Sequence, residues 1–303
     1  MLNIVFDRVS ELGAFLVGTG YVFAPLYLLA SLAIGSGLWL ARAPRMSLPA
    51  FLFPREIYRH ASVELDVRLT CLNTVILGLG GLSFAMLGPL VASGLASALG
   101  GRHMTAVLTP VASGLALALV LFLIDDFCRF ALHFIHHKLP ALWPFHEVHH
   151  SAEVLTPLTF FRAHPVYFFV QRMLITACSG LLQAVVAVAA FGRIDPWVFF
   201  AAGFPWTAYM LGGIHLRHSH IPVRYARWAE GIFVSPYLHQ LHHSIDEQHR
   251  DVNFGEVLSI WDRLFGTLHR PAATEPLIFG LSDGEGRQVQ PYPDLATALF
   301  APF

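Results

Sequence analysis

Three histidine-rich motifs carry the chemistry of this sequence. Of the 17 histidines in the chain, 14 lie between His133 and His249. The first motif is an HxxxH box formed by His133 and His137. On a helix, two rings four residues apart lie on one face. Neutral imidazole suits iron, zinc, copper and nickel, so this box is a candidate part of a metal site.

Two HxxHH boxes follow, and each places three imidazoles at helical spacings of i, i+3 and i+4. Their members are His146, His149, His150, His239, His242 and His243. Apolar residues such as Phe145, Val148 and Leu241 are interleaved with them, which argues against a solvated loop. Buried imidazoles need partners. Because eight nitrogens exceed the capacity of one octahedral ion, the boxes predict two metals with four to five ligands each.

Further polar residues near the boxes are candidates to support the metals. Asp126 lies seven residues before His133 on the same helical stripe, and we expect it to accept the outer N–H of an imidazole. Glu147, Asp246 and Asp262 are additional candidates for this role, although a structural cap or an ion pair with Arg263 is favoured for Asp262. His136 lies off the ligand face and is expected to be an outer neighbour.

The composition predicts that an integral membrane protein positions these boxes. Hydrophobic residues make up 55% of the 303 residues and charged residues 13%, where about 25% is usual for a soluble domain. The formal net charge is −1, so no basic field predicts nucleic-acid binding. The three cysteines are scattered, which excludes a disulfide scaffold, an iron–sulfur cluster and a zinc ribbon.

Five stretches are long and apolar enough to be candidate membrane spans. They are Leu12–Leu40, Leu69–Gly101, Met104–Ile124, Met173–Gly192 and Pro196–Ile214. Short polar tips at 100–103 and 193–196 join the second span to the third and the fourth to the fifth. These two pairs are therefore predicted to be tight hairpins. The alternative is that one pair dips into the membrane and returns without crossing it.

Arginine and lysine predict the orientation. The loop at 41–68 carries five arginines, whereas each hairpin tip carries one. By the positive-inside rule, the long loops and the region after His215 are cytoplasmic and the amino terminus is outside. All histidine boxes then lie on the cytoplasmic side of a multi-pass protein in the inner or plasma membrane.

The order HxxxH, HxxHH, HxxHH resembles the fatty acid hydroxylase/sterol desaturase superfamily of membrane di-iron enzymes. The flanking sequences at 142–146, 162–165 and 235–239 match as well, and so do the closing sequences at 253–255 and 261–267. The resemblance covers Asp125–Thr267. One departure is Phe134, where many members place arginine.

The resemblance implies a fold and a ligand set. The fold is all-α, with about four to five transmembrane helices and a cytoplasmic helical cap that holds a dinuclear metal site. Its expected parts are a transmembrane region at 1–124, a hydroxylase-like domain with two further membrane helices at 125–267, and a tail packed on the cap at 268–303. Additional metal ligands or outer neighbours are expected among His164, His215, His220 and His249. The implied ligands are His133, His137, His146, His149, His150, His218, His239, His242 and His243.

The resemblance also implies an oxidoreductase. Two iron ions, for which zinc can substitute in preparations, would use dioxygen to hydroxylate or desaturate a C–H bond of a fatty acyl chain or sterol. Electrons would come from a separate ferredoxin- or cytochrome-type donor with its reductase. The alternatives are a histidine-rich membrane protein that binds or transports metal, and an acyl-lipid desaturase. The sequence leaves open the lipid, the regiochemistry, the donor and the oligomeric state.

Overall fold

The computed structural model of the chain describes residues 24–42, 45–85, 94, 111–191 and 196–303. The described residues are mostly helical, as expected. Five longer helices correspond to the five predicted spans: α2 (Pro25–Arg42), α5 (Ala61–Ala85), α7 (Val111–Lys138), α9 (Pro165–Phe191) and α10 (Pro196–Leu211). The predicted start at Leu12 and the tips at 100–103 and 193–195 lie outside the described residues.

Three of the described helices are long and apolar enough to cross a membrane: α2, α7 and the part of α9 up to Gln183. Their outer surfaces are rich in exposed apolar side chains, such as Leu29 on α2 and Leu115 and Leu119 on α7. A hydrocarbon environment suits such surfaces, whereas water does not. The prediction of a membrane protein is supported, and the number of spans stays a prediction.

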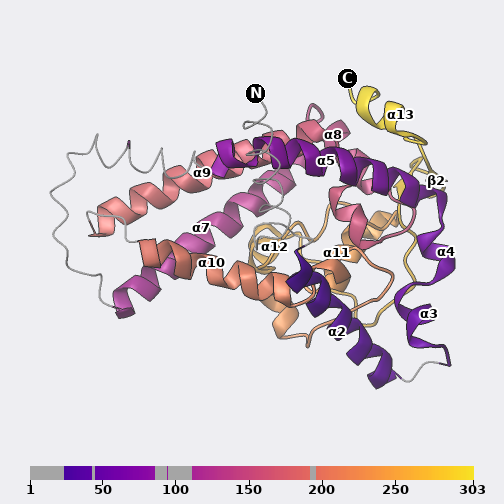
Figure 1. Cartoon of the computed structure of the whole chain (residues 1–303), viewed down its shortest axis with the longest axis horizontal. Helices are drawn as coiled ribbons and strands as arrows, with labels where there is room; N and C mark the ends of the chain where they lie inside the picture. Colours follow the sequence, from indigo (N-terminus) through magenta and orange to yellow (C-terminus); the bar gives the residue numbers. More distant parts are fainter. Residues whose placement is uncertain (1–23, 43–44, 86–93, 95–110, 192–195) are drawn as a thin grey trace, which may run out of the picture.

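Helix α7 connects the apolar region to the histidine boxes. It packs between α9 and α10, and the three helices run together away from the part of the molecule that holds α8, α11 and α12 (Figure 1). It continues unbroken through residue 124, the predicted domain boundary, and carries the first histidine box in its last turns. The apolar helix therefore holds this box rigidly.

The remaining elements are short and form the polar part of the molecule. Helix α8 holds the second histidine box and α11 the third, while proline in the first turn helps both to begin. One two-stranded antiparallel sheet pairs β1 with β2. The bounds are α3 (Leu48–Leu52), α4 (Arg55–Tyr58), α8 (Trp143–His150), η1 (Pro157–Phe161), η2 (Ile214–Leu216), η3 (Ala229–Gly231), α11 (Pro236–His242), η4 (Glu247–His249), α12 (Ile260–Phe265), β1 (Leu281–Ser282), β2 (Gln288–Val289) and α13 (Leu295–Phe300).

The carboxy-terminal tail packs on α5 and α8. Tyr292 and Ala298 share a buried apolar cluster with Leu65 and Leu69 of α5 and Val148 of α8. The Tyr292 hydroxyl also donates a hydrogen bond to Glu147. The tail thus covers the outer side of the helix that carries the second box.

Candidate metal centre

Nine histidines converge on two adjacent points in the polar part of the molecule. Within each group, one ring nitrogen from every histidine lies within 4.8 Å of the others. The first group, called here the five-histidine group, contains His133, His137, His146, His150 and His242. The second, called the four-histidine group, contains His149, His218, His239 and His243. These are the nine residues expected as ligands, and the structure brings all of them together.

Each HxxHH box divides its imidazoles between the two groups. In α8, the i and i+4 residues His146 and His150 belong to the five-histidine group, whereas His149 points to the other. The third box does the reverse, since His239 and His243 share the four-histidine group. The groups are in direct contact: the His150 and His243 rings stack with 4.6 Å between their centroids.

The spacing of the nitrogens fits two metal ions. Contacting Nε2 atoms are 3.0–3.2 Å apart in the five-histidine group and 2.9–3.2 Å apart in the other. Two ligand nitrogens about 2.1 Å from an ion and at a right angle would be about 3.0 Å apart. The donor set therefore suits a dinuclear centre built from nitrogen ligands.

Backbone carbonyls fix the tautomer of three of the rings. The Nδ1–H groups of His133, His149 and His242 donate to the carbonyl oxygens of Phe254, Arg162 and Val252, at 2.9, 3.1 and 2.7 Å. A proton held on Nδ1 leaves the Nε2 lone pair free for a metal. The sequence predicted carboxylates in this role, and no side-chain pattern could have identified carbonyls.

Charged residues face two other rings. An Asp251 oxygen lies 3.5 Å from Nδ1 of His137. The Arg217 guanidinium donates to Nδ1 of His239 at 2.8 Å and pairs with Glu256 at 2.8 Å. Burial alone would raise the pKa of Glu256, but Arg217, His133 and Arg129 together lower it. Arg217 and Glu256 were not identified from the sequence, where an arginine beside a histidine gives no signal.

Burial lowers the pKa values of the candidate ligands and so favours their neutral form. It lowers the pKa of His149 to about 3, with repulsion from His133 adding to the effect. Burial and the neighbouring imidazoles also hold the pKa values of His146, His150 and His243 well below the usual 6.5. A neutral imidazole is the form that binds metal. The centre is thus ready to bind at neutral pH.

Asp126 and Asp262 accept hydrogen bonds from backbone N–H groups and not from imidazoles. Asp126 accepts hydrogen bonds from the N–H groups of Val257 and Leu258 and from the Trp261 indole, at 2.9–3.1 Å. Asp262 accepts from the N–H groups of Phe254 and Gly255, in keeping with the structural role favoured for it. Both carboxylates hold the loop whose Phe254 carbonyl orients His133, so their effect on the centre is indirect.

The other candidate acids and histidines lie outside both groups. Glu147 accepts a hydrogen bond from the Tyr292 hydroxyl, and the Asp246 carboxylate accepts one from the backbone N–H of Gln248. Each of the five other candidate histidines uses a ring nitrogen in a contact outside the two groups. The contacts are His136 with the Leu132 carbonyl, His164 with the Leu299 carbonyl, His215 with the Ser31 hydroxyl, His220 with the Phe51 carbonyl and His249 with the Glu275 carboxylate.

Buried Arg162 anchors the second box. Its guanidinium donates to the carbonyls of Val148 and Ser151 at the end of α8, and to Asp66 on α5 at 2.9 Å. Both charged side chains are fully buried. Since the Arg162 carbonyl also accepts a hydrogen bond from the Nδ1–H of His149, this one residue connects α5 and α8 to the four-histidine group.

Comparison with known proteins identifies the domain that contains these groups. Residues 118–267 match the fatty acid hydroxylase family. The chain is similar to an ornithine lipid hydroxylase of Rhizobium tropici, with 29% identity over 57% of this chain and 47% of the relative. It is also similar to alkylglycerol monooxygenases of Homo sapiens and Danio rerio, with 24% and 25% identity over 53% of this chain and 32% of each relative.

The chain thus covers 47% of the length of the ornithine lipid hydroxylase and 32% of the length of the alkylglycerol monooxygenases. No solved structure matches it. The family match begins within α7 and ends just after α12, so it encloses all nine converging histidines. The domain at residues 118–267 therefore belongs to the fatty acid hydroxylase/sterol desaturase superfamily.

Proposed function

We propose that this protein is a membrane-bound lipid hydroxylase that holds two iron ions, one in each histidine group. The observation that supports this most is the convergence of nine neutral imidazoles on two adjacent points. When bound, the iron pair would supply the activation of dioxygen that insertion of oxygen into a C–H bond requires. Zinc in a purified sample would not contradict this, since imidazoles prefer zinc to ferrous iron.

The protein's own residues would hold and shield this centre. The carbonyls of Phe254, Arg162 and Val252 would keep three Nε2 atoms aimed inward. The nine ligands come from the end of α7, from α8 and α11, and from the segment after α10. Almost all are buried, which limits access of water to the metals.

The substrate we propose is a lipid that approaches the four-histidine group. A buried apolar cluster, which contains Phe161 and Ile214 with Phe160, Phe168 and Met210 packed against it, lies beside this group. The Phe160 ring is 6.0 Å from the ring of His218. Such a wall suits an alkyl chain. The relatives' names, an ornithine lipid hydroxylase and alkylglycerol monooxygenases, support a lipid of this kind.

The proposed location is a membrane with all the histidines on its cytoplasmic side. The lysine and arginine distribution supports this sidedness. A separate ferredoxin- or cytochrome-type donor with its reductase would then deliver electrons from the cytoplasm.

Metal transport is the competing function, and the contacts of the ionisable groups in the helices argue against it. Ionisable groups along a transport path would face a cavity or an ion. In α7, Asp125 instead binds Arg129, Ser179 and Trp206 at 2.8–2.9 Å. These groups satisfy one another within the helix packing.

Comparative lipid mass spectrometry tests the proposed function. Cells that express the protein should contain a lipid heavier by one oxygen atom than its precursor, and cells with the His149→Ala variant should not. A species lighter by two hydrogens would indicate desaturation. An unchanged lipid profile, with both metals bound and a functional electron donor present, would refute the proposal.

A further inference from the structure

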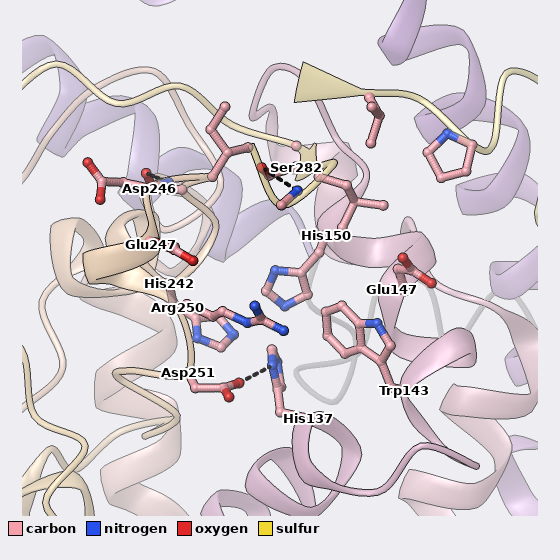
Figure 2. A pocket seen from close by; sticks show the side chains of 17 residues that line it. His137, Trp143, Glu147, His150, His242, Asp246, Glu247, Arg250, Asp251 and Ser282 are labelled. Carbon is pink, nitrogen blue, oxygen red and sulfur yellow. Dashed lines mark hydrogen bonds and ion pairs between the residues drawn. The ribbon is translucent and has the colours of Figure 1, made fainter. Parts of the chain in front are cut away.

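A pocket lined by several charged side chains reaches the five-histidine group from a side that the apolar wall does not cover. Its volume is about 510 Å³, and three of the group's members, His137, His150 and His242, line it. Figure 2 shows these three rings around the centre of the pocket. The Phe160 side chain stands instead against His218 of the other group. The two groups therefore have different surroundings.

The lining of the pocket is acidic. It includes four carboxylates, Glu147, Asp246, Glu247 and Asp251, and one arginine, Arg250. An adjacent hollow of about 520 Å³ shares Asp246 and Glu247 and adds the carboxylates of Glu275 and Glu285. A chain of carboxylates thus leads from the surface toward the histidines.

His137 lines this pocket and also belongs to the five-histidine group. The His137 side chain is only 6% exposed, and its Nε2 atom has no hydrogen-bond partner among the described residues. Figure 2 shows His137 beside Asp251, whose carboxylate lies 3.5 Å from the Nδ1 atom of the ring. A buried imidazole nitrogen without a hydrogen-bond partner, in a group that an acidic pocket reaches, is a candidate acceptor for a cation.

We propose that this pocket is the route by which a divalent metal ion enters the five-histidine group. The inference rests on the proposed function. The exposed carboxylates of Asp246 and Glu247 attract the ion, and His137 is the first imidazole that it meets. The guanidinium of Arg250 lies among the three rings in Figure 2 and opposes entry by its charge. The four carboxylates of the pocket suit a hydrated cation.

The test measures the rate of metal uptake by full-length protein in detergent after the metal has been removed with a chelator. Cobalt(II) is mixed with the protein at low ionic strength, and its visible absorption reports binding. The test variant is Asp246→Asn with Glu247→Gln, in which asparagine preserves the cap on Gln248. The control is Glu64→Gln with Asp294→Asn, which removes two negative charges at exposed positions outside the pocket. Like Asp246, Asp294 caps a helix, so the two pairs are matched.

The test variant should load about five times more slowly than the parent, with the same final cobalt content. The difference should disappear near 1 M salt, where charges are screened within about 3 Å. Arg250→Gln should load faster than the parent, and the control pair should load at the parent's rate. Equal rates for the test variant and the parent would overturn the route. A parent that takes up no metal would instead refute the proposed function.

Discussion

Replacing Asp66 by alanine tests whether α5 supports the metal centre. Asp66 and Arg162 form an ion pair at 2.9 Å with both side chains fully buried. The hydroxyls of Thr156 and Thr159 also donate to this carboxylate, so the variant leaves a buried cation and two hydroxyls without their acceptor. Removing one partner of a buried pair costs about 3–5 kcal/mol. That is a large part of the stability of a typical domain.

The assay is unfolding of the purified protein, followed by metal analysis. Because the Arg162 carbonyl orients His149, we expect metal to be lost first from the four-histidine group. Glu64→Ala on the same helix is the control, since Glu64 pairs with Arg68 at the surface and should cost less than about 1 kcal/mol. If Asp66→Ala were as stable as this control, the anchoring role of Arg162 would be wrong.

Four further predictions follow from the same structure. The variant His218→Ala should lose one metal per chain, because only three imidazoles remain in its group. The control His60→Ala, outside both groups, should keep two metals per chain. Elemental analysis measures the metal content of both. Gly255→Ala should destabilise the protein in thermal unfolding, because a Cβ would lie 2.7 Å from an Asp262 oxygen. Acid should destabilise the metal-free protein. Below pH 6.5 the unfolded chain binds protons at imidazoles that stay neutral in the folded protein, down to about pH 3 for His149. The midpoint temperature of thermal unfolding should therefore decrease as the pH is lowered. Single cysteines at the exposed positions Ser47 and Ser282, in a background without native cysteines, should react with a membrane-impermeant reagent only after cell lysis.

Residue type and spacing predicted eight of the nine converging histidines, because metal ligands must be specific side chains at helical intervals. His218 came from the resemblance to the family, since it belongs to no box. The division into five and four ligands could not be predicted. It depends on how α8 and α11 face each other, and on which members of each box point to which group.

The supporting contacts were the hardest part to predict. Asp126 lies on the expected stripe of α7, but its carboxylate binds the backbone of Val257 and Leu258 instead of an imidazole. Carbonyls supply the outer contacts of His133 and His242, and every residue has a carbonyl. Sequence spacing therefore identified most of the candidate ligands, while only the three-dimensional path of the loop identified what orients them.

Metal content tests the central claim most directly. The measurement is elemental analysis of the folded protein, purified from iron-supplemented cells, together with variants that remove His137 from one group and His218 from the other. The account predicts two metal ions per chain in the parent, and fewer in the His218→Ala variant than in the His137→Ala variant, whose group keeps four imidazoles. One ion or fewer in the parent, or full occupancy in both variants, would contradict it.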